Sequence, residues 1–244
     1  MDSQEAKRSG SIIWSLVEQD CSGEAFTCLQ PILAQPIPFH LLDTIGAASC
    51  FVPLTQTIPF LEQIAATRAM GGWPIIGSAL QMHLPENLTV CLEQARRFIM
   101  VGDVWYAVDI LSERVPGPAF LSAFDETLTH MDPWRSDPNP WVRRATGVAI
   151  HLWAKRRRGT PGTQDQAVQL LSFLEPQFEE HQIDAIKGVG WGLKTLGRYY
   201  PTQTADWLRQ QLFENKRKPR ALMLRKALTY LPEAEKAILF PGEA

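Results

Sequence analysis

The side chains best suited to bind a ligand are two sets of basic residues that recur in the second half of the sequence. The first set is Arg144, His151 and Lys155, and Arg158 follows on the same side. The second set is Lys187, Lys194 and Arg198. Both sets have offsets of 0, +7 and +11, and they lie 43 residues apart. Each set therefore follows one helix face, and a separation of about 40–47 residues is typical of stacked helical pairs. Two adjacent stripes would form a groove for a polyanion.

Trp105 and Asp109 place an aromatic ring and a carboxylate one helical turn apart. Residues four apart share a helix face, and the other face carries Val104, Val108 and Leu111, which suit a core. A carboxylate in such a place can stabilise a developing positive charge or position a water molecule. A surface tryptophan packed on the next helix beside a solvated aspartate has the same spacing, so the pattern alone admits both interpretations.

Arg144 and Trp191 add two further groups that suit nucleic acid. A guanidinium binds phosphate through paired hydrogen bonds, although it also forms salt bridges between helical repeats. Trp191 lies within the second basic set, and a ring between cations can stack on a sugar or a base. Core packing is the alternative for this ring. The apolar side of the same segment, however, is already supplied by Ile186, Val189 and Leu193.

The charge is divided unevenly along the chain. The net charge is −2, but residues 1–130 hold 6 Lys and Arg against 14 Asp and Glu, and residues 131–244 hold 18 against 12. The two parts thus carry −8 and +6. This asymmetry favours an anionic partner for the second half, although two solvated surfaces of opposite sign would give the same numbers.

Several classes of protein are not expected. The four cysteines form no Cys-x-x-Cys pair and no cluster with histidine, so we expect reduced, buried thiols in a cytoplasmic protein without a metal site. The sequence has no phosphate-binding glycine loop and no Gly-x-Ser-x-Gly segment, and no cofactor is expected. An apolar run of 18 residues and a signal peptide are both missing, which predicts no membrane association. The cysteines are Cys21, Cys28, Cys50 and Cys91.

The hydrophobic periodicity predicts helices and no strands. We expect helices near 11–20, 24–34, 39–51, 57–70, 73–82, 86–100, 102–114, 118–131, 138–158, 164–178, 181–198, 202–213, 219–230 and 232–239. Short connections between them indicate antiparallel pairs. The fold class is therefore all-α, a right-handed α-solenoid of HEAT-like repeats with a concave groove. Trp134, Trp153 and Trp207 are expected to pack in its core.

Three blocks of the sequence resemble the DNA alkylation repair family, the AlkD-like HEAT-repeat DNA glycosylases. Residues 104–109 (Val-Trp-Tyr-Ala-Val-Asp) are similar to that family's Trp-Trp-x-x-x-Asp segment. Residues 134–145 are similar to its Trp…Ser-Asp/Asn-x-x-Trp-x-x-Arg-Ala segment, and residues 186–194 to its Lys-Ala-x-Gly-Trp-x-Leu-Arg segment. A weaker similarity covers residues 225–228. The resemblance extends from about residue 57 to 232.

The resemblance implies a single domain over residues 1–244, with N-terminal helices in 1–56, motif-bearing repeats in 57–232 and a tail in 233–244. It also implies excision of N3- or N7-alkylated purines from double-stranded DNA by a monomeric, nucleoid-associated enzyme. Asp109 would be the catalytic carboxylate, Trp105 and Trp191 would cradle the deoxyribose, and Arg144 would contact the adjacent phosphate. The remaining basic residues of the two sets would contact the DNA backbone.

The sequence departs from the family pattern at three positions. Val104 replaces the first tryptophan of the pair, Tyr106 replaces an acidic residue, and Thr195 replaces a glutamate. These departures leave room for a non-catalytic HEAT-repeat protein that binds DNA, including branched DNA, or a protein partner. A scaffold that binds no nucleic acid is a third interpretation, which the overall negative charge permits.

Overall fold

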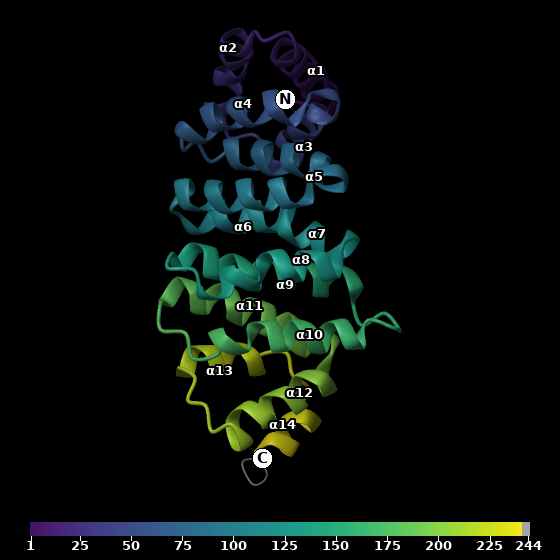
Figure 1. Cartoon of the computed structure of the whole chain (residues 1–244), viewed down its shortest axis with the longest axis vertical. Helices are drawn as coiled ribbons and strands as arrows, with labels where there is room; N and C mark the ends of the chain where they lie inside the picture. The colour runs from purple at the N-terminus through teal and green to yellow at the C-terminus, as the bar shows by residue number, and fades with distance from the viewer. Residues whose placement is uncertain (241–244) are drawn as a thin grey trace. The chain divides into compact units, whose positions relative to one another are not determined.

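The computed structural model describes residues 1–240, and these residues form an all-helical protein (Figure 1). The chain is 80% helical, and no strand occurs among the described residues. The prediction of an all-α fold is therefore confirmed. No helix of residues 1–240 has both the length and the apolar character that a bilayer crossing requires. The solenoid arrangement and the single domain remain predictions.

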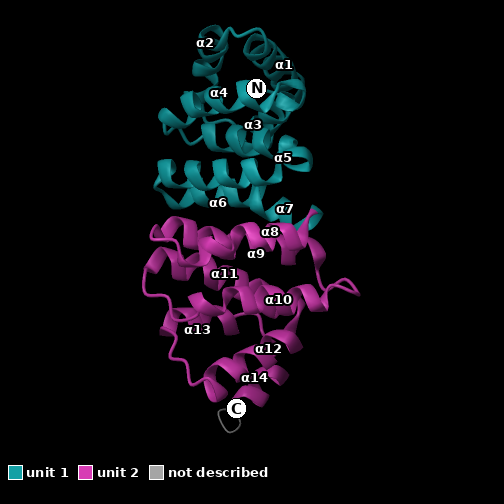
Figure 2. Cartoon of the chain, in the orientation of Figure 1, with its two compact units in different colours: residues 1–122 teal, residues 123–244 magenta. Residues whose placement is uncertain are grey.

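The chain divides into two compact units, residues 1–122 and residues 123–244 (Figure 2). In unit 1, α3 packs between α1 and α5, and α5 also packs on α4 and α6. The helices of unit 1 are α1 (Ser3–Glu18), α2 (Ser22–Leu33), α3 (Phe39–Ala47), α4 (Leu54–Ala66), α5 (Gly72–Gly102), α6 (Trp105–Arg114) and α7 (Pro116–Ser122), with a 3₁₀ turn over Ala48–Phe51.

Two helices of unit 1 differ from the predicted boundaries for local reasons. α1 begins at Ser3 rather than near residue 11, because Asp2 accepts hydrogen bonds from the first backbone N–H groups and Glu5 completes a capping box. α5 consists of two helical segments that meet at a kink, where Asn87 has non-helical torsion angles (φ −138°, ψ 42°). The two helices predicted at 73–82 and 86–100 are therefore both present, and the break between them lies slightly later in the chain than predicted.

Unit 2 contains two series of helices. α9, α11 and α13 pack one on the next, and α10, α12 and α14 form a second series. The helices are α8 (Phe124–Met131), α9 (Pro140–Arg157), α10 (Gln164–Leu174), α11 (Ile183–Tyr199), α12 (Pro201–Arg209), α13 (Ala221–Leu228) and α14 (Glu233–Leu239), with 3₁₀ turns over Asp132–Ser136 and Glu175–Gln177 and a π-helical stretch over Gln210–Glu214. The helix predicted at 118–131 is two helices, because Ala123 has non-helical torsion angles.

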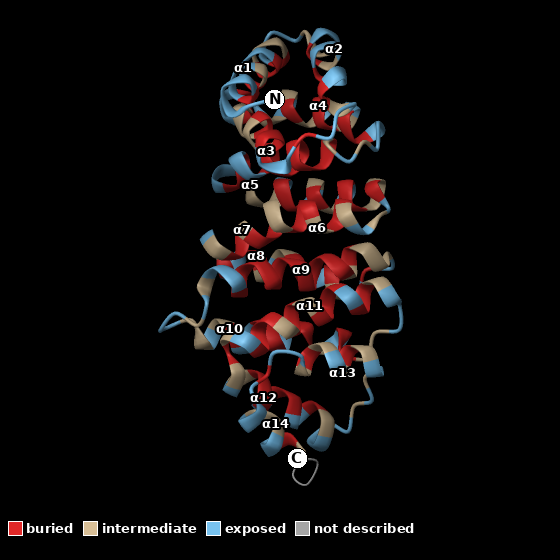
Figure 3. Ribbon diagram, turned by 180° about the vertical axis from the view of Figure 1, so that it is seen from behind, coloured by how far each residue is buried: buried red, intermediate tan, exposed pale blue. Residues whose placement is uncertain are grey.

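α9 is buried along most of its length, from Val142 to Ala154 (Figure 3). The sequence predicted a basic stripe along this helix that would line a groove open to a polyanion. That prediction is wrong for Arg144 and His151, which are only 6% and 7% exposed. The reason is that α11 covers α9 extensively on this side. Trp134, Trp153 and Trp207 are buried as predicted.

Glycines allow α9 and α11 to touch through their backbones. A Cβ atom on Gly147 would lie 2.2 Å from the carbonyl oxygen of Gly188, and one on Gly192 would lie 2.8 Å from the carbonyl oxygen of Gly147. Neither contact leaves room for a methyl group. The two helices are thus held at a separation that only glycine permits, and this fixes which side chains of α9 and α11 become neighbours.

Candidate nucleic-acid interface

In unit 1, α6 carries the predicted tryptophan and carboxylate. Trp105 is the first residue of α6, after Val104 in an extended conformation (φ −153°, ψ 144°). Its side chain is 57% exposed and meets Tyr106 edge-on, with the ring centres 5.7 Å apart. Asp109 follows one turn later and is half-buried. The opposite face of α6 is buried through residues that include Val108, as the pattern predicted.

Packing at both ends of α6 fixes this pair of residues. At the start, Asp103 adopts a left-handed conformation (φ 49°) that turns the chain between α5 and α6. Gly102 lies against Ala107, where a Cβ atom would be only 2.7 Å away from the Ala107 methyl group. At the end, Arg114 donates two hydrogen bonds to Asp43, at 2.6 and 2.9 Å. A helix anchored in this way can present Trp105 and Asp109 in one direction.

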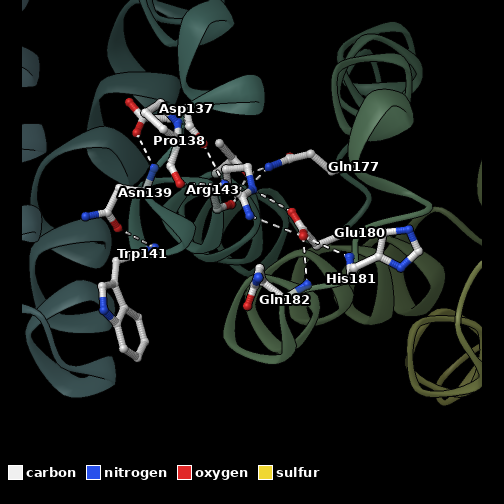
Figure 4. A network of polar contacts seen from close by, with 10 residues as sticks. Asp137, Pro138, Asn139, Trp141, Arg143, Gln177, Glu180, His181 and Gln182 are labelled. Atoms are coloured by element: carbon white, nitrogen blue, oxygen red, sulfur yellow. Dashed lines mark hydrogen bonds and ion pairs between the residues drawn. The ribbon is translucent and has the colours of Figure 1, made fainter.

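In unit 2, an arginine at the start of α9 binds a glutamate in the loop that precedes α11 (Figure 4). Arg143 donates to both carboxylate oxygens of Glu180, at 2.6 and 3.2 Å, and to the carbonyl oxygen of Asp137 at 2.6 Å. Glu180 also accepts hydrogen bonds from the N–H groups of His181 and Gln182. Burial raises the pKa of Glu180, but these hydrogen bonds outweigh it and hold the pKa below its usual value.

Arg144 is held between α9 and α11. Its Nη1 donates to the carbonyl oxygen of Asp184 (3.1 Å), and its stem lies against Gly188, where a Cβ atom would be 2.5 Å from Cγ. The side chain is therefore anchored within the helix contact. Lys187, one turn after the start of α11, is exposed and pairs with Asp184 at 3.4 Å.

His151 and Trp191 meet as stacked rings across the same helix contact. Their ring centres are 4.0 Å apart with an interplanar angle of 24°. Thr195 donates its hydroxyl proton to the carbonyl oxygen of Trp191, and its oxygen lies 2.7 Å from His151 Nδ1. Because the hydroxyl has a single proton, Nδ1 must be the donor to Thr195, and Nε2 carries the lone pair. Trp191 is half-buried rather than fully exposed.

His151 does not carry the positive charge that its place in the basic set suggested. Burial, and to a smaller extent the nearby charges of Lys155 and Lys194, together lower its pKa to about 4. The imidazole is thus neutral at pH 7. Burial also lowers the pKa of Lys226 on α13, together with the charges of Lys194 and Arg144. Neighbouring cations thus contribute to both shifts, after burial.

A pocket of about 160 Å³ lies between α9, α11 and the end of α13. Five of the residues singled out in the sequence line it, namely His151, Lys155, Trp191, Lys194 and Arg198. Thr195, Tyr199 and Tyr230 line it as well and were not predicted. Lys187 is not among the lining residues, and Arg158 caps the end of α9 in a left-handed conformation (φ 50°). We call this cavity the cationic pocket.

The family of the chain follows from comparison with known proteins. Residues 76–231, from α5 to just beyond α13, match the family model described as DNA alkylation repair enzyme. The chain belongs to the DNA alkylation repair enzyme family. The matched span includes Trp105, Asp109, Arg144 and Trp191. The comparison with curated proteins and the comparison with solved structures each gave no match.

Membership of the DNA alkylation repair enzyme family gives the candidate groups a common context. Unit 1 contributes the exposed indole and the carboxylate of α6, and unit 2 contributes the anchored guanidinium, the stacked indole and the cationic pocket. Within residues 1–240, no group of three or more His, Cys, Asp or Glu side chains is arranged to hold a metal ion. The cations of unit 2 are chemically suited to an anionic ligand, and the exposed indole of unit 1 is suited to pack on a sugar or a base.

Proposed function

We propose that this protein is a DNA glycosylase that excises N3- or N7-alkylated, positively charged purines from duplex DNA. The observation that carries the proposal is the pair on α6, where an indole that is 57% exposed stands one turn before Asp109 in a member of a DNA repair family. An exposed tryptophan of this size has no role in the core of unit 1. It is suited to pack against a ligand instead.

The chemistry requires few groups, because an alkylated purine cation is already a good leaving group. When the glycosidic bond breaks, its electron pair neutralises the departing base and positive charge develops on the sugar. Asp109 would stabilise that charge, orient a water molecule towards C1′ and accept the proton that the water loses. Trp105 and Trp191 would flank the sugar with their π faces, which favour a cationic ring.

The remaining residues would hold the DNA backbone. We assign Arg144 to the phosphate beside the lesion, with its contact to the Asp184 carbonyl fixing the orientation of the guanidinium. Lys155, Arg158, Lys187, Lys194 and Arg198 would make further backbone contacts, and the neutral His151 would act through packing and hydrogen bonding. A HEAT-like solenoid with a concave groove would bring the two units onto one duplex. Such a shallow groove suits a reaction that does not require a deep pocket for a flipped base.

The direct test is release of 7-methylguanine from methylated duplex DNA. Asp109→Asn keeps the size of the side chain and removes its charge, so release should slow by about 10²- to 10⁴-fold. Affinity for the DNA should stay within a few-fold of that of the unaltered protein. Asp125→Asn, an exposed carboxylate on α8, is the matched control and should release the base at the normal rate. Equal rates for the protein and Asp109→Asn would refute the proposed role of Asp109.

A non-catalytic DNA-binding protein is the second candidate. The cationic pocket favours it, because its cations all lie in unit 2 and their binding of DNA needs no carboxylate from α6. Val104 and Tyr106, at positions where the family pattern has tryptophan and an acidic residue, point the same way. DNA binding without release of any alkylated purine would establish this alternative.

A further inference from the structure

Two cations of the cationic pocket are packed on the ring of an exposed tyrosine. Lys194 Nζ lies 4.2 Å from the centre of the Tyr230 ring, and Arg198 Cζ lies 5.3 Å from it. Lys155 lines the same pocket from α9. Tyr230 itself is 46% exposed, just beyond the end of α13. The ring therefore supports two cations from the side of the solvent and adds little to the core.

These cations are not neutralised by acidic residues. Within the part of the chain that the structure describes, Lys155, Lys194 and Arg198 form no ion pair with a carboxylate, whereas Arg143, Lys187 and Arg217 of the same unit each do. A tyrosine ring attracts cations and orients them, but it leaves their charge in place. Burial is the main cause of the lowered pKa values of His151 and Lys226, and the charge of Lys194 lowers both pKa values further.

The size of the pocket restricts the ligand. Its volume is about 160 Å³, roughly half of the about 300 Å³ at which pockets for small molecules begin. A phosphate group with part of a sugar is small enough for it, while a complete nucleotide is not. An anion that enters such a pocket is therefore more suitably one group of a polymer than a free metabolite.

We propose that the cationic pocket binds one phosphodiester group of a DNA strand, and that Tyr230 is a positioning residue that holds Lys194 and Arg198 towards it. The proposal rests on the proposed function in one respect, namely that the ligand is DNA. It adds a defined phosphate site in unit 2, built by residues of α9 and α11 and by a tyrosine that follows α13. Lys155 adds a third cation to the site from α9.

The test measures binding of an unmodified duplex DNA by fluorescence anisotropy over a series of salt concentrations. Loss of one phosphate contact reduces the slope of log affinity against log salt by about 0.9. The double variant Lys194→Gln/Arg198→Gln should bind DNA more weakly, with a slope reduced by about one contact, because both cations serve the same phosphate. A reduction of about two contacts, or none, would overturn the assignment of a single phosphate.

A matched control removes the same number of positive charges outside the cationic pocket. Arg209 and Lys236 lie on α12 and α14, where they pair with Asp206 and Glu233 of their own helices. Arg209→Gln/Lys236→Gln should therefore leave the salt slope unchanged. A reduction as large as that of the pocket variant would mean that only the total charge matters, which would refute a defined site.

Two substitutions of Tyr230 test whether its aromatic ring is what positions Lys194 and Arg198. Tyr230→Phe keeps the ring and should retain the affinity and the salt slope of the unaltered protein. Tyr230→Leu removes the ring and should shift both values towards those of the Lys194/Arg198 variant. Since the side chain is exposed, unfolding midpoints should be similar for both variants. Normal DNA binding by Tyr230→Leu, or equal loss in both variants, would refute the role of the ring.

The outcome is independent of base excision because the probe carries no lesion. If the pocket variants bind DNA normally, the phosphate site is wrong, and the assay of Asp109→Asn still decides the proposed activity. If the slope changes as expected but no alkylated base is released, the excision activity is wrong and the phosphate site stands. Absence of duplex binding by the unaltered protein, or saturable binding of thymidine monophosphate in the pocket, would overturn the phosphodiester assignment.

Discussion

Unit 1 presents Trp105 on the first residue of a 10-residue helix, whereas unit 2 holds Trp191 in the middle of a 17-residue helix. Trp105 is mostly exposed and meets Tyr106 only by its edge, while Trp191 is half-buried and stacks on His151. The two indoles thus differ in what fixes them. Trp191 belongs to the packing of α9 on α11, and Trp105 stands outside the packing of its own unit.

The two units also differ in what holds their positively charged side chains. In unit 1, Arg97 pairs with Glu62 and Arg114 pairs with Asp43, so these arginines join helices. In unit 2, Arg143 and Arg217 have such structural partners, but the cations of the cationic pocket have a tyrosine instead. In unit 2, therefore, two cations held by an aromatic ring keep their positive charge available to a ligand.

The largest expected effect concerns the packing that fixes Trp191. Gly147→Ala should destabilise the protein by more than about 4 kcal/mol, because the new methyl group would overlap the backbone of Gly188 and Val189. Gly23→Ala on α2 is the control, since nothing lies within 4 Å of the added atom, and it should be neutral or stabilising by up to about 1 kcal/mol. Urea unfolding measures both. Equal urea midpoints for Gly147→Ala and the unaltered protein would show that the glycine contact is not required.

A smaller effect concerns the loss of stability at acidic pH that His151 causes. The unfolded chain takes up a proton at this histidine near pH 6.5, whereas the folded protein does so at about pH 4. Between these values the unfolded state binds more protons, so the free energy of unfolding should fall as the pH falls, by about 3 kcal/mol in all. His151→Gln should lose less stability over this interval. The same pH dependence in both proteins would mean that another group is responsible.

The smallest effect separates the two tryptophans. Trp105→Ala should change the free energy of unfolding by no more than about 0.5 kcal/mol, because the side chain is largely exposed. Trp191→Ala should cost about 2 kcal/mol, because it removes the stack on His151 and the contacts of a half-buried ring. Thermal or chemical unfolding of the two variants would decide. A larger loss for Trp105→Ala would reverse the comparison.

The sequence predicted helices well where both ends carry local signals. α11 spans Ile183–Tyr199 against a prediction of 181–198, and its apolar side is the buried one. It predicted poorly where a helix is interrupted by backbone geometry. The break at Ala123 between α7 and α8 leaves no mark in the hydrophobic pattern.

The candidate site shows a similar limit. The spacing predicted that Trp105 and Asp109 share one face of α6 but left open whether the ring is packed on a neighbouring helix; the ring is 57% exposed and Asp109 is half-buried. For α9 the same reasoning placed Arg144 and His151 on an open face, because the pattern of one helix does not show what its neighbour covers. Tyr230 was missed for a related reason, since its contact with Lys194 joins residues from different helices.

The glycines between α9 and α11 also have a mechanical consequence. Where Gly147 meets Gly188 and Gly192, no side chain separates the two backbones, so sliding or rotation of one helix against the other would cause a collision at this point. The pair must therefore move as one stiff body.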